Sequence, residues 1–117
     1  SSILLAMMAS GMNGQSFAFN GYLPIDKQER ARAIKRLEKH SGDYDQTQAF
    51  IETPYRNEQL LEDFTKNLSP TTQLSIACDL TLPTEWVKTA PVNQWKNSKV
   101  DLHKRPAIFL FHKELSI

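Results

Sequence analysis

Apolar and polar positions recur along the chain with two different periods, and the changes of period divide it into helices and strands. Apolar residues at helical spacing follow Asp26 and again follow Thr53, whereas short apolar runs separate these segments. The predicted order is α-β-α-β-α-β-β-α-β. We expect helices over residues 1–10, 27–40, 54–68 and 91–97, and strands over residues 17–23, 47–52, 73–78, 85–89 and 107–112.

This order of elements predicts an α/β domain in which helices pack on a sheet of about five strands. The loop between residues 78 and 85 is too short for a parallel crossover, so the sheet should be mixed and largely antiparallel. The length of 117 residues and a hydrophobic content of 40% suit one domain over residues 1–117. The glycine-rich and catalytic motifs of nucleotide-binding, zinc-dependent and hydrolase folds do not occur.

The net charge and the cysteine content argue against a strongly basic nucleic-acid-binding or membrane-binding protein, a disulfide-bonded protein and a metal-binding protein. The net charge of +1, from 14 basic and 13 acidic residues, provides no general attraction to nucleic acid or membrane. One cysteine, Cys78, cannot form an internal disulfide and has no neighbour at metal-ligand spacing, and the three histidines are isolated. We therefore expect a cytoplasmic protein without a metal site.

The first residues form an apolar run that is shorter than the ~20 residues needed to span a bilayer, and no basic segment precedes it. We interpret this run as a buried helix. Because the chain begins inside an apolar helix without an initiator methionine, we expect it to be part of a longer protein.

The stretch FIETPYRN, residues 50–57, joins a predicted strand to a predicted helix. Thr53 suits a helix cap, and Pro54 suits the first helical position, where a missing N–H costs nothing. Glu52 lies at the carboxyl end of the strand, where α/β proteins bind ligands. Arg56 places a positive charge in the first helical turn, where the helix dipole disfavours cations. We therefore expect it to face an anion or a carboxylate such as Glu52.

Other turns admit both a structural and a functional interpretation. Ser1 and Ser2 are a helix cap or a ligand contact, residues 79–84 are a polar loop or a second contact, and Pro106 begins an edge strand or borders a site. The basic helix over residues 27–39 is a solvated face or a surface for RNA phosphates. Trp86 and Trp95 suit the core or a subunit interface.

Together, these segments resemble the carboxyl-terminal half of the tetrapyrrole methylase superfamily, and within it the ribosomal RNA small subunit methyltransferase I branch. FAFNGYLP at residues 17–24 and ETPYR at residues 52–56 are the specific elements, and the likeness extends in order over nearly the whole chain. Asp79 replaces the usual Glu, Ile51 replaces the usual Tyr, and KRPAIFLF at residues 104–111 replaces the usual Lys-Gly-Glu ending. These departures leave the methyl acceptor open.

The resemblance implies the second domain of an S-adenosylmethionine-dependent methyltransferase that works as a homodimer. The amino-terminal domain is absent from residues 1–117, so we expect no methyl transfer by this chain alone. Arg56, Asn57 and the basic helix are candidates for contacts with the acceptor, which in that branch is the ribose of ribosomal RNA. No catalytic base is identified, although Glu52 is conceivable. The implied cofactor-binding residues are Ser1, Ser2, Ile51, Glu52, Leu80, Thr81, Pro106 and Ala107.

Two other functions are kept open by the sequence. One is methylation of a tetrapyrrole or another small acceptor, for which we expect an apolar trough without a basic rim. The other is a non-catalytic dimerisation module that has kept the fold.

Overall fold

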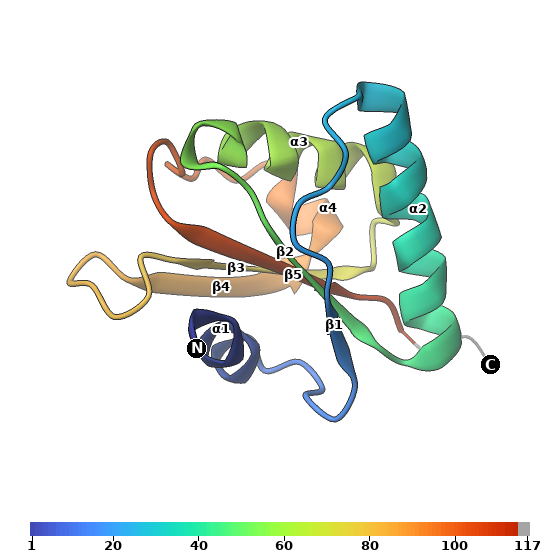
Figure 1. Cartoon of the computed structure of the whole chain (residues 1–117), viewed down its shortest axis with the longest axis horizontal. Coiled ribbons are helices and arrows are strands. Elements are labelled where there is room, and N and C mark those ends of the chain that lie inside the picture. The colour runs from blue at the N-terminus through green and yellow to red at the C-terminus, as the bar shows by residue number, and fades with distance from the viewer. Residues whose placement is uncertain (115–117) are drawn as a thin grey trace.

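A single five-stranded sheet forms the centre of the computed structural model, which describes residues 1–114. Its strand order is β1-β2-β5-β3-β4. β1 pairs with β2 in parallel, and the β2–β5, β5–β3 and β3–β4 pairs are antiparallel (Figure 1). The strands are β1 (Phe17–Phe19), β2 (Thr47–Ile51), β3 (Gln73–Cys78), β4 (Trp86–Pro91) and β5 (Ala107–His112).

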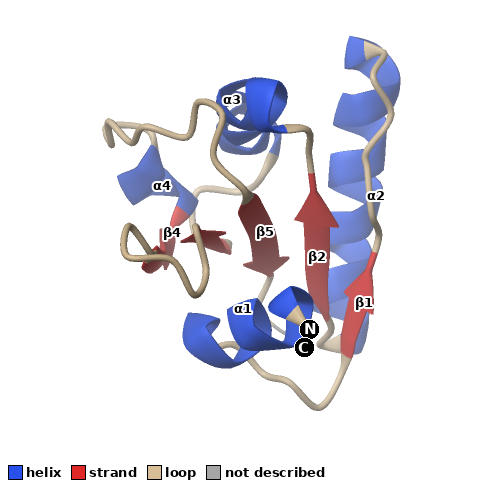
Figure 2. Cartoon of the chain, turned by 60° about the vertical axis from the view of Figure 1, so that its left-hand side comes forward, coloured by secondary structure: helices blue, strands red, loops and turns tan. Residues whose placement is uncertain are grey.

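Helices cover both faces of the sheet, but unequally. Among the helices of residues 1–114, α1 lies on one face, whereas α2, α3 and α4 lie on the other, as Figures 1 and 2 show from two directions. A short 3₁₀ turn, η1 (Pro54–Arg56), leads from β2 into α3. The helices are α1 (Ser2–Ser10), α2 (Lys27–Tyr44), α3 (Asn57–Asn67) and α4 (Val92–Trp95).

The larger core lies between the sheet and α2, α3 and α4. Phe50, Phe64 and Phe111 pack there with ring centroids 5.2–5.7 Å apart, at the separations that favour aromatic pairs. Trp95 is fully buried, and its Nε1–H donates to the carbonyl oxygens of Leu74 at 2.8 Å and Ala90 at 3.1 Å. Trp95 is therefore a core residue, one of the two roles the sequence allowed.

A smaller core lies beneath α1. Ala49 and Ala77 present small side chains on this face of the sheet, beside Ile108. Ala6 and Met7 of α1 pack against them and are buried. The contact places the amino-terminal end of α1 near the ends of the central strands, which matters for the site described below.

The predicted fold class is confirmed, and each predicted helix and strand is present. β3 and β5 have the predicted bounds. The predicted end of the second helix at residue 40 is wrong, because α2 continues through Gly42 to Tyr44. It ends where Asp45 adopts a left-handed φ of 51° and donates its N–H to the Ser41 carbonyl oxygen. β1 is shorter than predicted, since Gly21 turns the chain with a φ of 65°.

Candidate cofactor-binding site

One edge of the sheet gathers the carboxyl ends of β2 and β3 and the amino end of β5. A cavity of about 370 Å³ opens at this edge, on the side of α1. Ile3, Ile51 and Ile108 give it apolar walls, and the remaining lining residues come from the strand ends and the loops beside them. These are Ser2, Phe19, Glu52, Ala77, Asp79, Leu80, Leu82, Pro106 and Ala107.

Most of the residues predicted to bind cofactor meet at this cavity. Segments that are far apart in the sequence, at residues 2, 51–52, 80 and 106–107, converge there. Ser1 and Thr81 adjoin lining residues in the chain but do not themselves line the cavity. The predicted residues that line it are Ser2, Ile51, Glu52, Leu80, Pro106 and Ala107.

Glu52 is bound by Arg30, and this differs from the predicted pairing with Arg56. Arg30 Nη2 lies 2.6 Å from Glu52 Oε2, its Nη1 lies 3.4 Å from Asp63, and both side chains of the Arg30–Glu52 pair are about 95% buried. The second Glu52 oxygen accepts the N–H of Thr53 at 2.8 Å. Both Glu52 oxygens are therefore engaged, so this carboxylate supports the cavity wall more readily than it could serve as a base.

Arg30 departs from the prediction that the basic residues of the helix over residues 27–39 form a solvated face or an RNA surface, because its side chain is buried. Arg30 lies one turn before Ala33 and Ile34, and the three share the buried face of α2. Its Nε also donates to the carbonyl oxygen of Pro24 at 3.0 Å. Thr53 occupies the predicted cap position, but its side chain makes no capping hydrogen bond.

Asp79 is the second carboxylate of the cavity. Thr84 Oγ1 and Arg105 Nε each donate to Asp79 Oδ2 at 2.8 Å, and these two hydrogen bonds hold the pKa of Asp79 below its usual value. The loop that follows is tightly folded, with left-handed φ values of 52° at Asp79 and 70° at Thr81. Glu85 Oε1 accepts the Thr81 N–H at 2.7 Å. Leu80 is thereby held at the wall.

Arg56 and Asn57 were predicted to contact the acceptor, and the structure gives them different surroundings. Asn57 is fully buried, and its Nδ2 donates to the carbonyl oxygens of Arg105 at 2.7 Å and Leu102 at 3.2 Å. This side chain is committed to the loop before β5. Arg56 is exposed and makes no side-chain hydrogen bond or ion pair within residues 1–114.

Sequence reasoning missed two arginines that organise the site. Arg30 could have been found, because a charged residue at the spacing of the apolar face of a helix must be paired. Arg105 offered no comparable local signal, since its partners Asp79 and Thr84 lie more than twenty positions away in the sequence.

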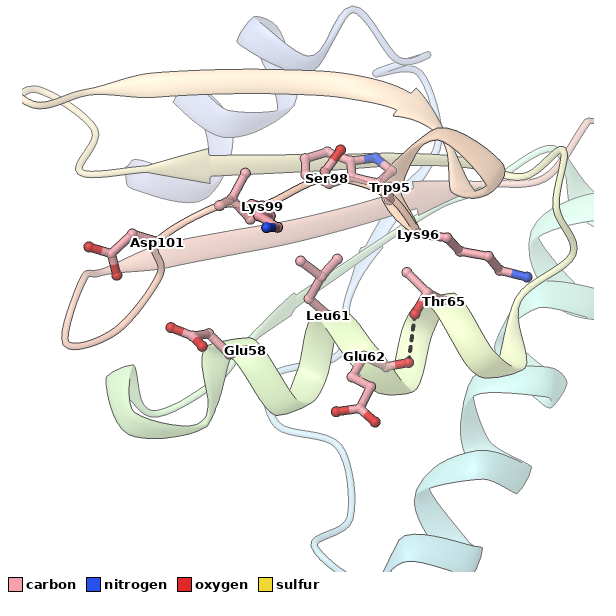
Figure 3. Close-up of a pocket in the computed structure, with 10 residues that line it drawn as sticks. Glu58, Leu61, Glu62, Thr65, Trp95, Lys96, Ser98, Lys99 and Asp101 are labelled. Carbon is pink, nitrogen blue, oxygen red and sulfur yellow. Dashed lines mark hydrogen bonds between the residues drawn. The ribbon is translucent and has the colours of Figure 1, made fainter.

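A second hollow lies on the other face of the sheet. It is an open groove of about 620 Å³ between α3, α4 and residues 96–101, with Leu61 and Trp95 lining it among charged side chains (Figure 3). Thr65 Oγ1 donates to the Glu62 carbonyl oxygen at 2.8 Å there. None of the predicted site residues lines this groove.

Residues 1–114 contain no cluster of side chains suited to hold a metal ion. Across the same residues, no helix has the length and apolar character needed to cross a bilayer.

Comparisons with solved structures agree on the fold of the chain. A cobalt precorrin-4 methyltransferase of cobalamin biosynthesis matches 96% of this chain and 48% of its own, with a TM-score of 0.62 and 16% identity. The chain has the tetrapyrrole methylase fold. A uroporphyrin-III C-methyltransferase from Thermus thermophilus, solved with S-adenosyl homocysteine, matches 97% of this chain and 49% of its own, with a TM-score of 0.54 and 15% identity.

A curated relative extends the likeness to the sequence. Ribosomal RNA small subunit methyltransferase I from Vibrio cholerae serotype O1 is 26% identical over 113 residues, which cover 94% of this chain and 38% of the relative. No family model matches. The chain thus spans less than half the length of these methyltransferases, and it corresponds to the second half of the tetrapyrrole methylase fold, as predicted from its motifs.

Proposed function

We propose that this chain is the second domain of an S-adenosylmethionine-dependent methyltransferase and that its strand-end cavity holds part of the cofactor. The observation that carries the proposal is the convergence of Ser2, Glu52, Leu80 and Pro106 on one cavity, in a chain with this fold. The Thermus thermophilus neighbour that was solved with S-adenosyl homocysteine supports the same cofactor.

The lining suits a nucleoside with an aliphatic chain. Ile3, Ile51 and Ile108 offer apolar contact to a purine ring and to methylene groups, while the carboxylates of Glu52 and Asp79 are held by arginines. The first N–H groups of α1 have no partner within the helix and lie beside Ser2 at the wall. In this proposal, the chain contributes binding and alignment.

Methyl transfer depends more on the alignment of cofactor and acceptor than on reactive side chains. The cofactor supplies an electrophilic methyl group, and an acceptor oxygen must approach it in line with the bond that breaks. A second domain would supply the remaining half of the cofactor site and cover the cavity. Exposed apolar side chains at the cavity, Phe19 and Leu82, support such a cover because they would otherwise remain in water.

We propose ribose of ribosomal RNA as the acceptor. The Vibrio cholerae relative, which acts on ribosomal RNA by its name, supports this choice. So do Arg32, Lys35 and Arg36, which are exposed along α2 and have no carboxylate partner within residues 1–114. Phosphate contacts by such side chains would position RNA without reading its sequence.

Methylation of a tetrapyrrole is the second candidate, because the solved neighbour from Thermus thermophilus is a uroporphyrin-III methyltransferase and the cavity walls are largely apolar. The test is methyl transfer from labelled S-adenosylmethionine by the full-length protein, offered either small ribosomal subunits or a uroporphyrinogen. Label in the RNA ribose would support the first candidate. Label in the tetrapyrrole alone would replace it with the second.

We also retain the homodimer as a proposal. Leu4, Leu5 and Met8 form an exposed apolar face on α1, which a second copy or the companion domain would cover. Sedimentation of the full-length protein tests it, and a monomer at micromolar concentration would contradict it.

A further inference from the structure

A small basic and aromatic surface borders the candidate cavity. Tyr55 of η1 is 70% exposed, and the His103 ring meets it edge-on with centroids 5.8 Å apart. Lys104 Nζ lies 5.8 Å from the centroid of the Tyr55 ring. Arg56 follows Tyr55 and is also exposed. We call Tyr55, Arg56, His103 and Lys104 the basic–aromatic rim.

The rim comes from two chain segments, and each segment adjoins a residue that lines the cavity. η1 begins two residues after Glu52, and Lys104 precedes Pro106 by two, and both Glu52 and Pro106 line the cavity. The Lys104 N–H donates to the Pro54 carbonyl oxygen at 3.3 Å, which joins the two segments. The rim thus adjoins the cavity, and a molecule with one end in the cavity could extend onto it.

The loop that carries His103 and Lys104 is held in place from below. Asn57 Nδ2 donates to two of its carbonyl oxygens, and the Arg105 guanidinium donates to the carbonyl oxygens of Asp101 at 2.9 Å and Thr84 at 3.0 Å. Lys104 adopts a left-handed φ of 59°, which is unfavourable for a residue with a long side chain. These contacts maintain a strained backbone that presents Lys104 to the Tyr55 ring.

The chemistry of the rim suits single-stranded nucleic acid. An exposed tyrosine flanked by cations offers a stacking surface for a base and partners for the adjoining phosphates. Within residues 1–114, Arg56 and Lys104 have no carboxylate partner. The nearby carboxylate of Asp101 accepts the N–H of His103 at 3.1 Å. A duplex would keep its bases stacked and could not use the tyrosine face in this way.

We propose that the rim stacks an unpaired base of the acceptor RNA on Tyr55 and binds the flanking phosphates through Arg56 and Lys104. This inference rests on the proposed function in taking RNA as the acceptor. It adds that the RNA is recognised single-stranded next to the cavity.

The test uses the full-length protein and a fluorescent single-stranded RNA of the small subunit, with the same sequence in a duplex as comparison. Tyr55→Ala should weaken binding of the single strand roughly 5- to 150-fold, the range expected for one lost base stack. Tyr55→Phe should stay within about twofold of wild type because it retains the ring. Tyr44→Ala is the matched control, since Tyr44 is 69% exposed at the far end of α2.

Salt dependence separates the roles of the cations. Lys104→Gln and Arg56→Gln should each reduce the slope of log affinity against log salt by about 0.7, the value for one phosphate contact on a single strand. Tyr55→Phe should leave that slope unchanged.

Three outcomes overturn the inference. Tyr55→Ala binds the single-stranded RNA as tightly as wild type, it loses equal affinity for the single strand and the duplex, or it loses affinity for a tetrapyrrole and not for RNA. Binding of S-adenosylhomocysteine by each variant is measured in parallel. A wild-type protein that binds single-stranded RNA through Tyr55 but no cofactor would contradict the proposed function and leave the rim intact.

Discussion

Arg105 Nε donates a hydrogen bond of 2.8 Å to Asp79 Oδ2, and this contact joins the loop before β5 to the loop after β3. Leu80 and Pro106, which follow the two partners in the chain, both line the candidate cavity. This ion pair adds to the hydrogen bond from the Asp79 N–H to the Pro106 carbonyl oxygen at 2.9 Å, and both contacts join two walls of the cavity.

The Asp79 contact predicts a dependence of stability on acid. Hydrogen bonds from Thr84 and Arg105 hold the pKa of Asp79 below its usual value of 3.8. A depressed folded-state pKa stabilises the protein above the usual value, and this contribution is lost as the pH falls through the folded-state pKa. The free energy of unfolding of wild type should therefore exceed that of Asp79→Asn at neutral pH, and the difference should shrink below about pH 4. Urea titrations over this range test it, and a difference independent of pH would contradict it.

Removal of Arg30 should be among the costliest single changes at the site. Arg30→Ala leaves the carboxylates of Glu52 and Asp63 buried without their cation, which costs about 3–5 kcal/mol of unfolding free energy for pairs of this kind. Arg32→Ala, on the exposed face of the same helix, should stay within about 0.5 kcal/mol of wild type. Similar urea midpoints for the two variants would show that the pair contributes little.

Adjacent residues 56 and 57 should behave oppositely. Asn57→Ala removes the donor for two carbonyl oxygens in the loop before β5 and should destabilise the protein by about 1–3 kcal/mol. Arg56→Ala should change the melting temperature little but weaken RNA binding. Thermal denaturation with RNA titration on both variants separates stability from binding, and a large loss of stability in Arg56→Ala would make that residue structural.

Cys78 should resist alkylation in the folded protein. Burial raises the pKa of its thiol, so little thiolate is present at neutral pH and reagents have poor access. Labelling with a maleimide should be slow in buffer and rapid in denaturant. Fast labelling without denaturant would mean that β3 opens readily.

Most of the fold could be predicted because its local signals agree with its packing. Apolar periodicity located α2 and α3, and the short β3–β4 connection implied antiparallel pairing. The end of α2 could not be predicted, since Gly42 lies inside the helix, which continues to Tyr44 and not only to residue 40. Residue types at a turn do not show whether the helix still packs against the core at that point. Ser41 and Gly42 are polar or small, and yet they lie on the buried face of α2.

The cavity wall could be predicted from strand ends, but its side-chain partners could not. The sequence predicts that Glu52 pairs with the nearest arginine in the chain, Arg56. In the fold, α2 packs beside β2, and Arg30 of α2 pairs with Glu52 instead. Arg105 and Asp79 are likewise joined only by the pairing of β3 with β5. Contacts between distant segments depend on strand order, which no local pattern specifies.

Calorimetric binding of S-adenosylhomocysteine to the full-length protein tests the central claim most directly when it is combined with a substitution at the cavity. Leu82 lines the cavity and is 49% exposed, so Leu82→Trp should obstruct it without disturbing the core, whereas Ile25→Trp makes a comparable change at a residue that does not line it. We predict binding by wild type and Ile25→Trp, and affinity at least roughly tenfold lower, about 1.4 kcal/mol, for Leu82→Trp. Absence of binding by wild type, or equal affinity in all three proteins, would contradict the assignment of this cavity to the cofactor.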